Sequence, residues 1–396
     1  MDIIILADFC GSFEKKDNSR FLYLADLLCK EHKVEIVTSD FNHGMKEYFK
    51  VTPTDFPYKI TMLHEGRYKK NVSLSRFKGH YIWGKQVAEY LKKRKRPDIV
   101  YCAVPTLKAS YEAGLYCKKN KIRFIIDIQD LWPEAFQMVF NVPVMSKLLF
   151  APFKYLADSI YSNADEIFAV SQTYVNRALK VNNKCRNGYS IFLGTELEIF
   201  DKNAKEVPII KKREGELWLA YCGTLGKSYD IECVIKALAL LKSRGIEVPR
   251  FVVMGEGSKA RELRKLAKQN EVDVSFTGML PYNKMCALLC QCDMVVNPIS
   301  CGAAQSIINK HADYAASGLP VLNTQENVEY RKLVNVYKMG INCKNNDEYD
   351  LADKIEILLK DEHMRKEMGS NARKCAEEKF DRKKTYKKII RIINEV

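Results

Sequence analysis

The chain of 396 residues is too long for one ordinary hydrophobic core, and it suits two domains of about 200 residues each. Its 47% hydrophobic and 11% aromatic residues exclude a disordered protein, and no run of about 18 apolar residues predicts a membrane span. The first residues, MDIIILADF, are too short and too acidic for a signal peptide. We therefore expect a cytosolic protein, with a strongly basic net charge of +15.

The first half of the chain alternates strand-like and helical patterns. Strands are expected at 3–7, 34–39, 59–64, 98–103, 123–128 and 166–171, with helices near 18–31, 79–94, 106–119, 146–162 and 172–182. Such alternation is typical of parallel strands joined by crossover helices, which together form a doubly wound sheet.

A second series of the same kind follows a charged, irregular stretch at 200–216. Its strands are expected at 217–222, 250–255, 273–278, 293–299 and 320–324, with helices near 229–243, 258–269, 283–291, 306–316 and 348–360. Two basic helical segments, 362–379 and 381–393, end the chain. The pattern predicts two Rossmann-like domains, and ligands of such sheets bind beyond the carboxyl ends of the strands.

The helix expected at 306–316 has the most informative surroundings. It follows the buried-strand pattern DMVVNPI and the loop SCGAAQ. Gly302, Ala303 and Ala304 allow a ligand to approach the backbone, and a helix start offers unpaired N–H groups and the positive end of the helix dipole. This combination predicts an anion site.

One stripe of that helix is polar, because Ser306, Lys310, Asp313 and Ser317 fall on the same side at about 100° per residue. A solvated helix face has the same pattern. Beside the small-residue loop, however, Lys310 is expected to neutralise a diphosphate without a metal ion. Asp313, one turn further, is expected to accept hydrogen bonds from ribose hydroxyls.

Other glycine turns end strands of the same half. Gly223 and the nearby Lys227 lie in YCGTLGKSYDI, where the lysine is placed to reach a phosphate. Gly255 lies in VVMGEGSK, and Gly278 ends the strand DVSFTG. Each turn alone is more often structural, but several at strand ends of one domain indicate a nucleotide.

In the first half, DIQDLWPEAF ends a strand with Asp127, Asp130 and Glu134 around Trp132. Carboxylates beside an aromatic ring suit sugar recognition, although helix-capping acids give the same pattern. Gly11, in the turn FCGSFEKKDNSR after the first strand, marks a second place where an acceptor is expected.

Basic residues concentrate between Lys59 and Arg123, where 17 Lys and Arg face 4 Asp and Glu. The densest run is Lys92–Arg96, and the pattern favours an anionic membrane surface over a merely solvated basic face. The segment 146–161 adds apolar and cationic residues at helical spacing, which is also the pattern of an ordinary core helix. No recognisable nucleic-acid-binding module accompanies the charge.

Metal chemistry finds little support in the sequence. Among 13 scattered cysteines, only Cys286, Cys290 and Cys292 cluster, and packed, reduced thiols explain them better than zinc. No D-x-D pair ends a strand, which disfavours a carboxylate-bound magnesium ion.

Four segments resemble the signatures of the retaining glycosyltransferases of family four: DIQDLWPE, SNADEIFAVSQ, YCGTLGKSYDIECVIKAL and INKHADYAASGLPVLNT. The resemblance covers nearly the whole chain. It implies the α/β fold called GT-B, in which two Rossmann-like doubly wound domains face each other across a cleft. It also implies the domains 1–200, for the acceptor, and 201–380, for the nucleotide sugar, with a C-terminal helix, 381–396, that packs back on the first domain.

The same resemblance implies transfer of a hexosyl or N-acetylhexosaminyl group from a nucleotide diphosphate sugar, usually a UDP-sugar, with retention of configuration. The most similar subgroup uses a lipid-linked (polyprenyl diphosphate) saccharide in the synthesis of bacterial capsule, O-antigen or exopolysaccharide. A peripheral enzyme on the inner membrane face is therefore expected, with no metal cofactor. An epimerase of the same fold, or an inactive nucleotide-sugar-binding scaffold, is the alternative.

Residue roles follow by position. Gln305 and Asp313 stand where the family has two glutamates, Gln129 stands near the place of a first-domain histidine, and Thr224 replaces an arginine. The resemblance thus implies Lys310, Asp130 and Gln305 as catalytic residues. It implies donor binding by Gly223, Thr224, Lys227, Gly255, Gly278, Gly302, Ala303, Ala304, Ser306, Lys310 and Asp313, and acceptor binding by Gly11, Asp127, Asp130 and Trp132.

Overall fold

The computed structural model describes residues 1–395 except 12, 14–18, 71–72, 138–142 and 303–306. The chain divides into two compact units, Met1–Ile191 with Lys388–Val396, and Phe192–Lys387. The first boundary therefore falls nine residues earlier than the expected position at 200. The return to the first unit falls at Lys388 rather than at 381.

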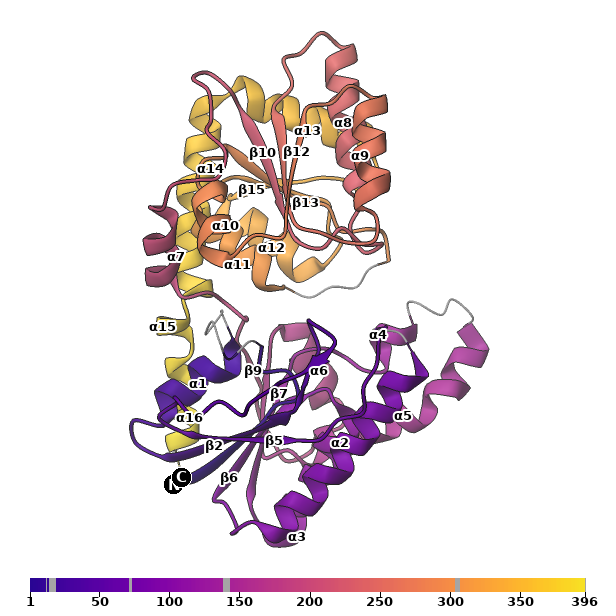
Figure 1. Cartoon of the computed structure of the whole chain (residues 1–396), viewed down its shortest axis with the longest axis vertical. Helices are drawn as coiled ribbons and strands as arrows, with labels where there is room; N and C mark the ends of the chain where they lie inside the picture. The colour runs from indigo at the N-terminus through magenta and orange to yellow at the C-terminus, as the bar shows by residue number, and fades with distance from the viewer. Residues whose placement is uncertain (12, 14–18, 71–72, 138–142, 303–306, 396) are drawn as a thin grey trace. The chain divides into compact units, whose positions relative to one another are not determined.

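The first unit is a parallel sheet covered by helices (Figure 1). Its strands run in the order β5-β2-β1-β6-β7-β8-β9, and β3 and β4 form a separate hairpin. The strands are β1 (Asp2–Leu6), β2 (Lys33–Ser39), β3 (Phe41–Asn42), β4 (Glu47–Tyr48), β5 (Lys59–Leu63), β6 (Ile99–Val104), β7 (Arg123–Ile128), β8 (Glu166–Ala169) and β9 (Tyr189–Ser190). The helices are α1 (Arg20–Leu28), α2 (Leu74–Lys93), α3 (Leu107–Asn120), α4 (Glu134–Gln137), α5 (Pro143–Asn163), α6 (Gln172–Leu179) and α16 (Lys387–Asn394).

The second unit has a sheet in the order β12-β11-β10-β13-β14-β15, again parallel. Its strands are β10 (Trp218–Cys222), β11 (Arg250–Met254), β12 (Val274–Gly278), β13 (Met294–Asn297), β14 (Val321–Asn323) and β15 (Gly340–Asn342). Its helices are α7 (Leu197–Ala204), α8 (Ile231–Ser243), α9 (Ala260–Gln269), α10 (Tyr282–Leu289), α11 (Asn309–Ala316), α12 (Val328–Tyr337), α13 (Glu348–Lys360), α14 (Glu362–Cys375) and α15 (Arg382–Thr385), with a π-helix η1 (Ala376–Phe380).

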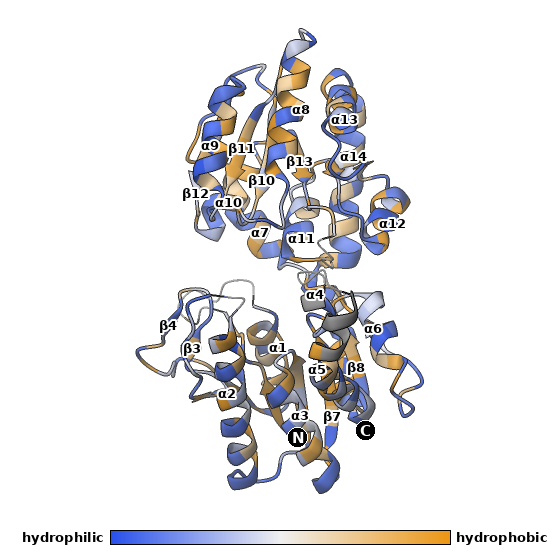
Figure 2. Ribbon diagram, turned by 90° about the vertical axis from the view of Figure 1, so that its right-hand side faces the viewer, coloured by the Kyte–Doolittle hydropathy of each residue, from blue (hydrophilic) through white to orange (hydrophobic). Residues whose placement is uncertain are grey.

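The central strands are buried on both faces, which is why they read as continuous apolar runs. Ile3, Ile4 and Ile5 of β1 have no exposed surface, and β10 of the second unit is equally enclosed. In Figure 2 the strands of the sheets are coloured mainly as hydrophobic, whereas the helices combine hydrophobic and hydrophilic residues. Cys286 and Cys292 of the cysteine cluster are buried in this core, Cys290 is half-buried, and none of the three forms a disulfide bond.

The last helix, α16, belongs to the first unit because its backbone is held there. Arg123 donates hydrogen bonds to the carbonyl oxygens of Ile392, Ile393 and Glu395. Asn394 contacts His32 through a 2.8 Å hydrogen bond. Ile389 and Ile393 are fully buried on the apolar side of this basic helix.

Several elements differ from the sequence expectations. Helix α2 begins at Leu74 rather than 79, because the Ser73 hydroxyl caps it by accepting from the Arg76 amide. Helix α11 begins at Asn309 rather than 306, since Ile308 is extended. Helix α12 and strand β15 were not expected. In the part of the chain that the structure describes, no helix has the length and apolarity that a membrane span requires.

Candidate active site

Both sheets reverse their winding at a central strand, and this fixes where a ligand can bind. In the second unit the chain winds outward from β10 to β11 and then returns to β13 on the other side of β10. The loops after β10 and β13 therefore diverge at the carboxyl ends of neighbouring strands. Such a switch point is the usual ligand site of an open α/β sheet.

The two loops at this switch point are tied together by hydrogen bonds. The Asp230 amide donates to the Pro298 carbonyl at 2.7 Å, and the Ser300 amide donates to Ser228 at 3.0 Å. The Ser300 hydroxyl also donates to the carbonyl of Lys227 at 2.8 Å. The loop that carries Lys227 thus has a fixed backbone while its side chain is exposed.

Lys310 is the central feature of the site. It lies on the first turn of α11 and is 91% buried, with its Nζ atom 3.7 Å from the ring centre of Tyr229 and 4.5 Å from that of Tyr221. Its hydrogen bond is a long one, 3.4 Å to the Tyr221 hydroxyl. Among the described residues, no carboxylate lies within salt-bridge distance of Nζ.

This environment disfavours the protonated form of Lys310. Burial lowers the pKa of Lys310 to about 7, because the ammonium loses water and gains no anionic partner. The two ring faces attract the cation, but each such contact contributes only about 1 to 2 kcal/mol. A ligand that brings negative charge to Nζ would remove this penalty.

Gly223 makes the approach of the lysine possible. Its φ of +144° is one that favours glycine, and a Cβ atom there would lie 2.9 Å from the Tyr221 hydroxyl and 3.0 Å from Lys310 Nζ. Gly255 supports it from the next loop, since a Cβ at Gly255 would lie 1.8 Å from the Gly223 carbonyl oxygen. The two glycines, both expected in the donor site, therefore allow the loop after β10 to pack closely against the loop after β11.

Helix α11 is positioned by two of its own side chains. The Tyr314 hydroxyl accepts a hydrogen bond from the Cys222 amide at the end of β10. His311 Nδ1 accepts from the Ile308 amide at 2.9 Å and so caps the helix start. Burial and the charge of Lys310 lower the pKa of His311 to about 3, so the cap is neutral.

The remaining predicted donor residues are placed as follows. Thr224 and Gly302 are exposed at the loops after β10 and β13, and Gly278 bridges to Gly255 beside the end of β12. Ala303, Ala304, Gln305 and Ser306 lie outside the described residues.

Asp313 departs from its expected role. Its Oδ1 accepts a 2.8 Å hydrogen bond from the Tyr282 hydroxyl, which in turn lies 2.9 Å from the Thr195 hydroxyl. Burial raises the pKa of Asp313 to about 6. The carboxyl group thus faces α10 and the start of the unit, whereas Lys310 faces β10. Lys310 and Asp313 are thus buried rather than solvated, and these two charged residues of the stripe meet different neighbours.

In the first unit the sheet order reverses between β1 and β6, so the loops after these strands mark the corresponding switch point. A cavity of about 140 Å³ lies beside the loop after β1, lined among others by Asp8, Phe9, Gly11 and His43. The expected glycine turn at Gly11, with φ +85°, is therefore part of this cavity.

Asp127 is a structural residue in this fold. It has no exposed surface, and its oxygens accept from Arg20 at 2.6 and 3.1 Å, from the Tyr101 hydroxyl at 2.7 Å and from Gln129 at 2.8 Å. With its acceptor capacity used inside the core, Asp127 has no oxygen left for a saccharide. This corrects the expectation that it binds the acceptor.

Trp132 also differs from expectation, because its ring packs against protein side chains. His80 stacks on it at 5.5 Å with an interplanar angle of 20°, and Arg76 lies 5.0 Å from its centre. The ring is 95% buried, so it offers no platform for a sugar.

Asp130 stays partly exposed at the end of β7. It accepts from the Leu131 amide at 2.9 Å and from Trp132 Nε1 at 3.1 Å, and burial raises its pKa. Glu134, the third acid of this segment, pairs with Arg177 at 2.5 Å. Asp130 Oδ1 also accepts a 3.4 Å hydrogen bond from the Tyr174 hydroxyl, and both Asp130 and Glu134 keep a partly exposed surface.

Sequence reasoning missed several residues around these loops. Tyr221 and Tyr229 enclose Lys310, and Asp8, Glu65 and His80 converge in the first unit. Their position directly after strands was a usable signal for Asp8 and Glu65. No periodicity indicates which tyrosine meets a lysine 80 residues away.

The fold and its two strand-end switch points define a GT-B protein, with two Rossmann-like units in one chain. A family model described as "Glycosyl transferases group 1" matches residues 202–375. This match lies within the second unit and agrees with the resemblance drawn from the sequence.

Three known proteins illustrate the relationship. An uncharacterized glycosyltransferase of Methanocaldococcus jannaschii is 27% identical over 256 residues, which span 63% of this chain but only 64% of that protein. A protein of Campylobacter jejuni, named as a GalNAc-alpha-(1->4)-GalNAc-alpha-(1->3)-diNAcBac-PP-undecaprenol alpha-1,4-N-acetyl-D-galactosaminyltransferase, is 23% identical over 94% of this chain and 93% of its own length. The crystal structure of Anabaena HepE in complex with UDP superposes with a TM-score of 0.73 at 14% identity and covers 100% of both chains.

Proposed function

We propose that this protein is a retaining glycosyltransferase that moves a hexosyl or N-acetylhexosaminyl group from a UDP-sugar to a lipid-linked saccharide on the inner face of a bacterial membrane. The observation that carries the proposal is Lys310, a buried lysine without an anionic partner among the described residues, at the switch point of a group 1 glycosyltransferase unit. A UDP-bound structural neighbour and a relative named for a polyprenyl diphosphate acceptor support it.

In this proposal Lys310 acts by charge. The glycosidic bond to the diphosphate breaks with negative charge developing on the leaving oxygen, and an ammonium fixed beside that oxygen stabilises the transition state. The exposed Lys227 is free to fold over the phosphates from the neighbouring loop. No metal ion is needed for this neutralisation.

The acceptor needs no separate base in a front-face reaction, because the departing phosphate oxygen takes its proton while the new bond forms on the same side. Asp130 then orients the acceptor through its free lone pairs, and Gln305, if it reaches the donor sugar, does so as a neutral hydrogen-bonding group. The cavity beside Gly11 is our candidate for part of the acceptor saccharide site.

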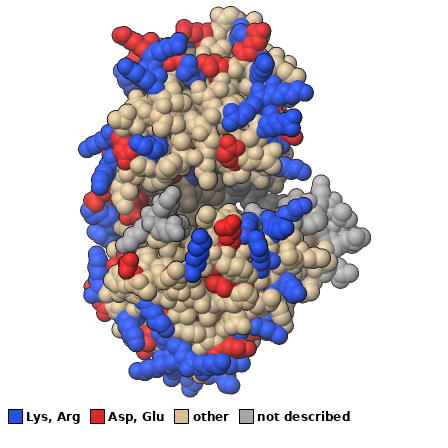
Figure 3. Space-filling view, viewed as in Figure 1, with Lys and Arg blue, Asp and Glu red and all other residues tan. Residues whose placement is uncertain are grey.

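The proposed membrane contact concerns the basic segment 59–123, whose charged residues the fold places at two separate ends of the first unit. The segment 59–123 is not one basic surface, because α2 separates its charges by about 30 Å. Lys92 and Lys93 lie on the last turn of α2, near the amino ends of the strands, while Arg94 is bound internally to Asp2 and Glu35. Basic side chains gather at that end of the first unit in Figure 3.

The other end of α2 suits a membrane better, because exposed apolar and basic residues occur together there. Leu74 is 88% exposed at the start of α2, and Leu149 and Tyr155 of α5 are each 66% exposed beside Lys154. A contact of 5.3 Å between the rings of Phe77 and Phe153 joins the two helices. Apolar side chains among cations favour an anionic lipid surface.

Incubation with UDP-sugars and a polyprenyl diphosphate saccharide tests the enzymatic part. Release of UDP only when the acceptor is present supports the transferase, with Lys310→Met as the inactive control. An interconverted UDP-sugar without acceptor would identify an epimerase. Binding of UDP-sugar without any turnover would identify a scaffold.

Co-sedimentation with vesicles tests the membrane part. The variant Leu149→Glu with Tyr155→Glu should lose binding to anionic vesicles at least tenfold, whereas Lys92→Glu with Lys93→Glu should change it less than threefold. The reverse order of effects, or equal binding to neutral vesicles, would contradict the assignment of this surface.

A further inference from the structure

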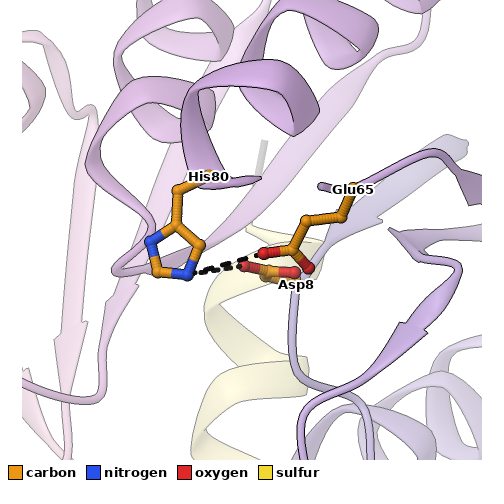
Figure 4. A group of neighbouring side chains, drawn as sticks. All are labelled: Asp8, Glu65 and His80. Carbon is orange, nitrogen blue, oxygen red and sulfur yellow. Dashed lines mark ion pairs between the residues drawn. The ribbon is translucent and has the colours of Figure 1, made fainter. Parts of the chain in front are cut away.

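Three buried side chains of the first unit turn toward one point, as Figure 4 shows, and we name them the Asp8 cluster: Asp8, Glu65 and His80. Asp8 follows β1, Glu65 follows β5 and His80 lies on α2. His80 Nε2 is 3.6 Å from Glu65 Oε1 and 4.0 Å from Asp8 Oδ2, and all three atoms lie within 4.8 Å of one another.

The oxygens that face this point have no hydrogen-bond partner. The Asp8 side chain has no exposed surface, and neither of its oxygens is hydrogen-bonded. Glu65 Oε1 is likewise unsatisfied, although Oε2 accepts from the Ser39 hydroxyl at 2.6 Å. A buried carboxylate oxygen without a donor is costly, so the fold has left room for a group that supplies positive charge.

Protein cations do not fill this role completely. Arg76 Nε donates a long hydrogen bond of 3.4 Å to His80 Nε2, which an ion bound at that nitrogen would replace, and both Asp8 oxygens remain without a hydrogen bond. One guanidinium therefore stands against two carboxylates.

The separations fit a cation. Zinc bonds to nitrogen and oxygen of about 2.0 to 2.2 Å imply ligand atoms about 3.4 Å apart in a tetrahedron. The separations of 3.6 and 4.0 Å from His80 Nε2 to the two carboxyl oxygens exceed this by about 0.2 and 0.6 Å. We propose that the Asp8 cluster binds one divalent transition-metal ion, of the Zn²⁺ or Mn²⁺ class. An imidazole with two carboxylates suits these ions better than Mg²⁺ or Ca²⁺.

The surroundings hold the three ligands in place. A Cβ atom at Gly79 would lie 2.4 Å from the Gly66 carbonyl oxygen, so a glycine in α2 is what lets the loop with Glu65 approach His80. Trp132 stacks on the imidazole, and Ser39 orients the Glu65 carboxylate. Asp8 also lines the cavity beside Gly11, which gives the ion an entry and a place for a further ligand.

This inference does not rest on the proposed function. The ion would be held by the first unit, whereas Lys310 of the second unit is the group proposed to neutralise the donor diphosphate. A metal ion in the Asp8 cluster is therefore compatible with donor binding that needs no metal ion.

Metal content and binding of the full, tag-free chain test the proposal. After chelation and desalting, calorimetric titration with Zn²⁺ and with Mn²⁺ should give one site per chain, and Asp8→Asn or His80→Gln should weaken it at least tenfold. His64→Gln is the matched control, because it removes an exposed histidine one residue from Glu65. Its binding should equal that of the wild type.

A second measurement covers variants that fold poorly. Crystals of the wild type soaked in MnCl₂ should show an anomalous peak within about 2.5 Å of the Asp8, Glu65 and His80 ligand atoms. No stoichiometric binding of either ion by the folded wild type, or full binding by both cluster variants, overturns the proposal. In that case a proton shared between the carboxyl groups of Asp8 and Glu65, rather than a metal ion, stabilises the cluster.

Discussion

Binding of UDP should be coupled to proton uptake by Lys310. In the free protein the pKa of this lysine is about 7, so at pH 8 about nine-tenths of the molecules carry a neutral amine. A diphosphate beside Nζ restores the charged form. Each binding event at pH 8 should therefore take up about 0.9 proton, with the nucleotide itself fully ionised at that pH.

The same coupling sets the pH dependence of affinity. Because the bound state has the higher lysine pKa, binding is favoured at low pH and weakens as the pH rises above 7. The loss should be close to tenfold per pH unit from 8 to 9, or about 1.4 kcal/mol, and it should continue up to the ordinary lysine pKa near 10.5.

Isothermal titration in buffers of different ionisation enthalpy measures the proton uptake directly. Lys310→Met should bind UDP at least a hundredfold more weakly and abolish the uptake in whatever binding remains. Lys227→Met, which removes an exposed lysine of the neighbouring loop, should keep the uptake even if affinity falls. Tight UDP binding by the wild type at pH 8 without net proton uptake would refute the placement of the diphosphate at Lys310.

Three other expectations concern single side chains. Gly223→Ala should reduce UDP affinity at least tenfold by calorimetry, because the new methyl group meets Tyr221 and Lys310; Gly245→Ala, also at positive φ but with open space around it, should bind normally. Asp313 has a folded pKa of about 6, above its usual 3.8, so the stability it contributes is full below pH 3.8 and is lost as the pH rises through 6. Urea unfolding should therefore show about 1 kcal/mol less dependence on pH between 5 and 7 for Asp313→Asn than for the wild type. Arg20→Met should lower the free energy of unfolding by about 3 to 5 kcal/mol, because it leaves the buried Asp127 carboxylate without its cation, whereas Arg391→Met, which breaks an exposed pair, should change it by less than about 1 kcal/mol. Equal effects of the two arginine substitutions would remove the structural role assigned to Asp127.

The strands and their order of alternation with helices were readable from the sequence because burial on both sheet faces leaves an apolar run. The short elements could not be predicted in this way. Strand β15 has only three residues, and α12 mixes charges with a modest apolar face, so neither forms a recognisable hydrophobic pattern. The early start of α2 depended on Ser73, a cap that the period of the apolar residues does not reveal.

Lys310 was also readable as a candidate site residue, because it lies close along the chain to a strand end and a helix start. Its burial was not, because that depends on Tyr221 and Tyr229 arriving from another strand. Asp127 shows the opposite case. Its position at a strand end suggested a ligand site, but Arg20, 107 residues earlier, occupies the carboxylate.

The sequence by itself determined what is local: two series of buried strands, glycine turns at their ends and short signature segments in both halves of the chain. Only the tertiary structure decided which polar groups at those ends are already paired, as Asp127 is, and which are buried without a partner, as the Asp8 oxygens are. The reason is physical. Periodicity records which face of an element is apolar, whereas hydrogen bonds and charges are satisfied between elements far apart in the chain.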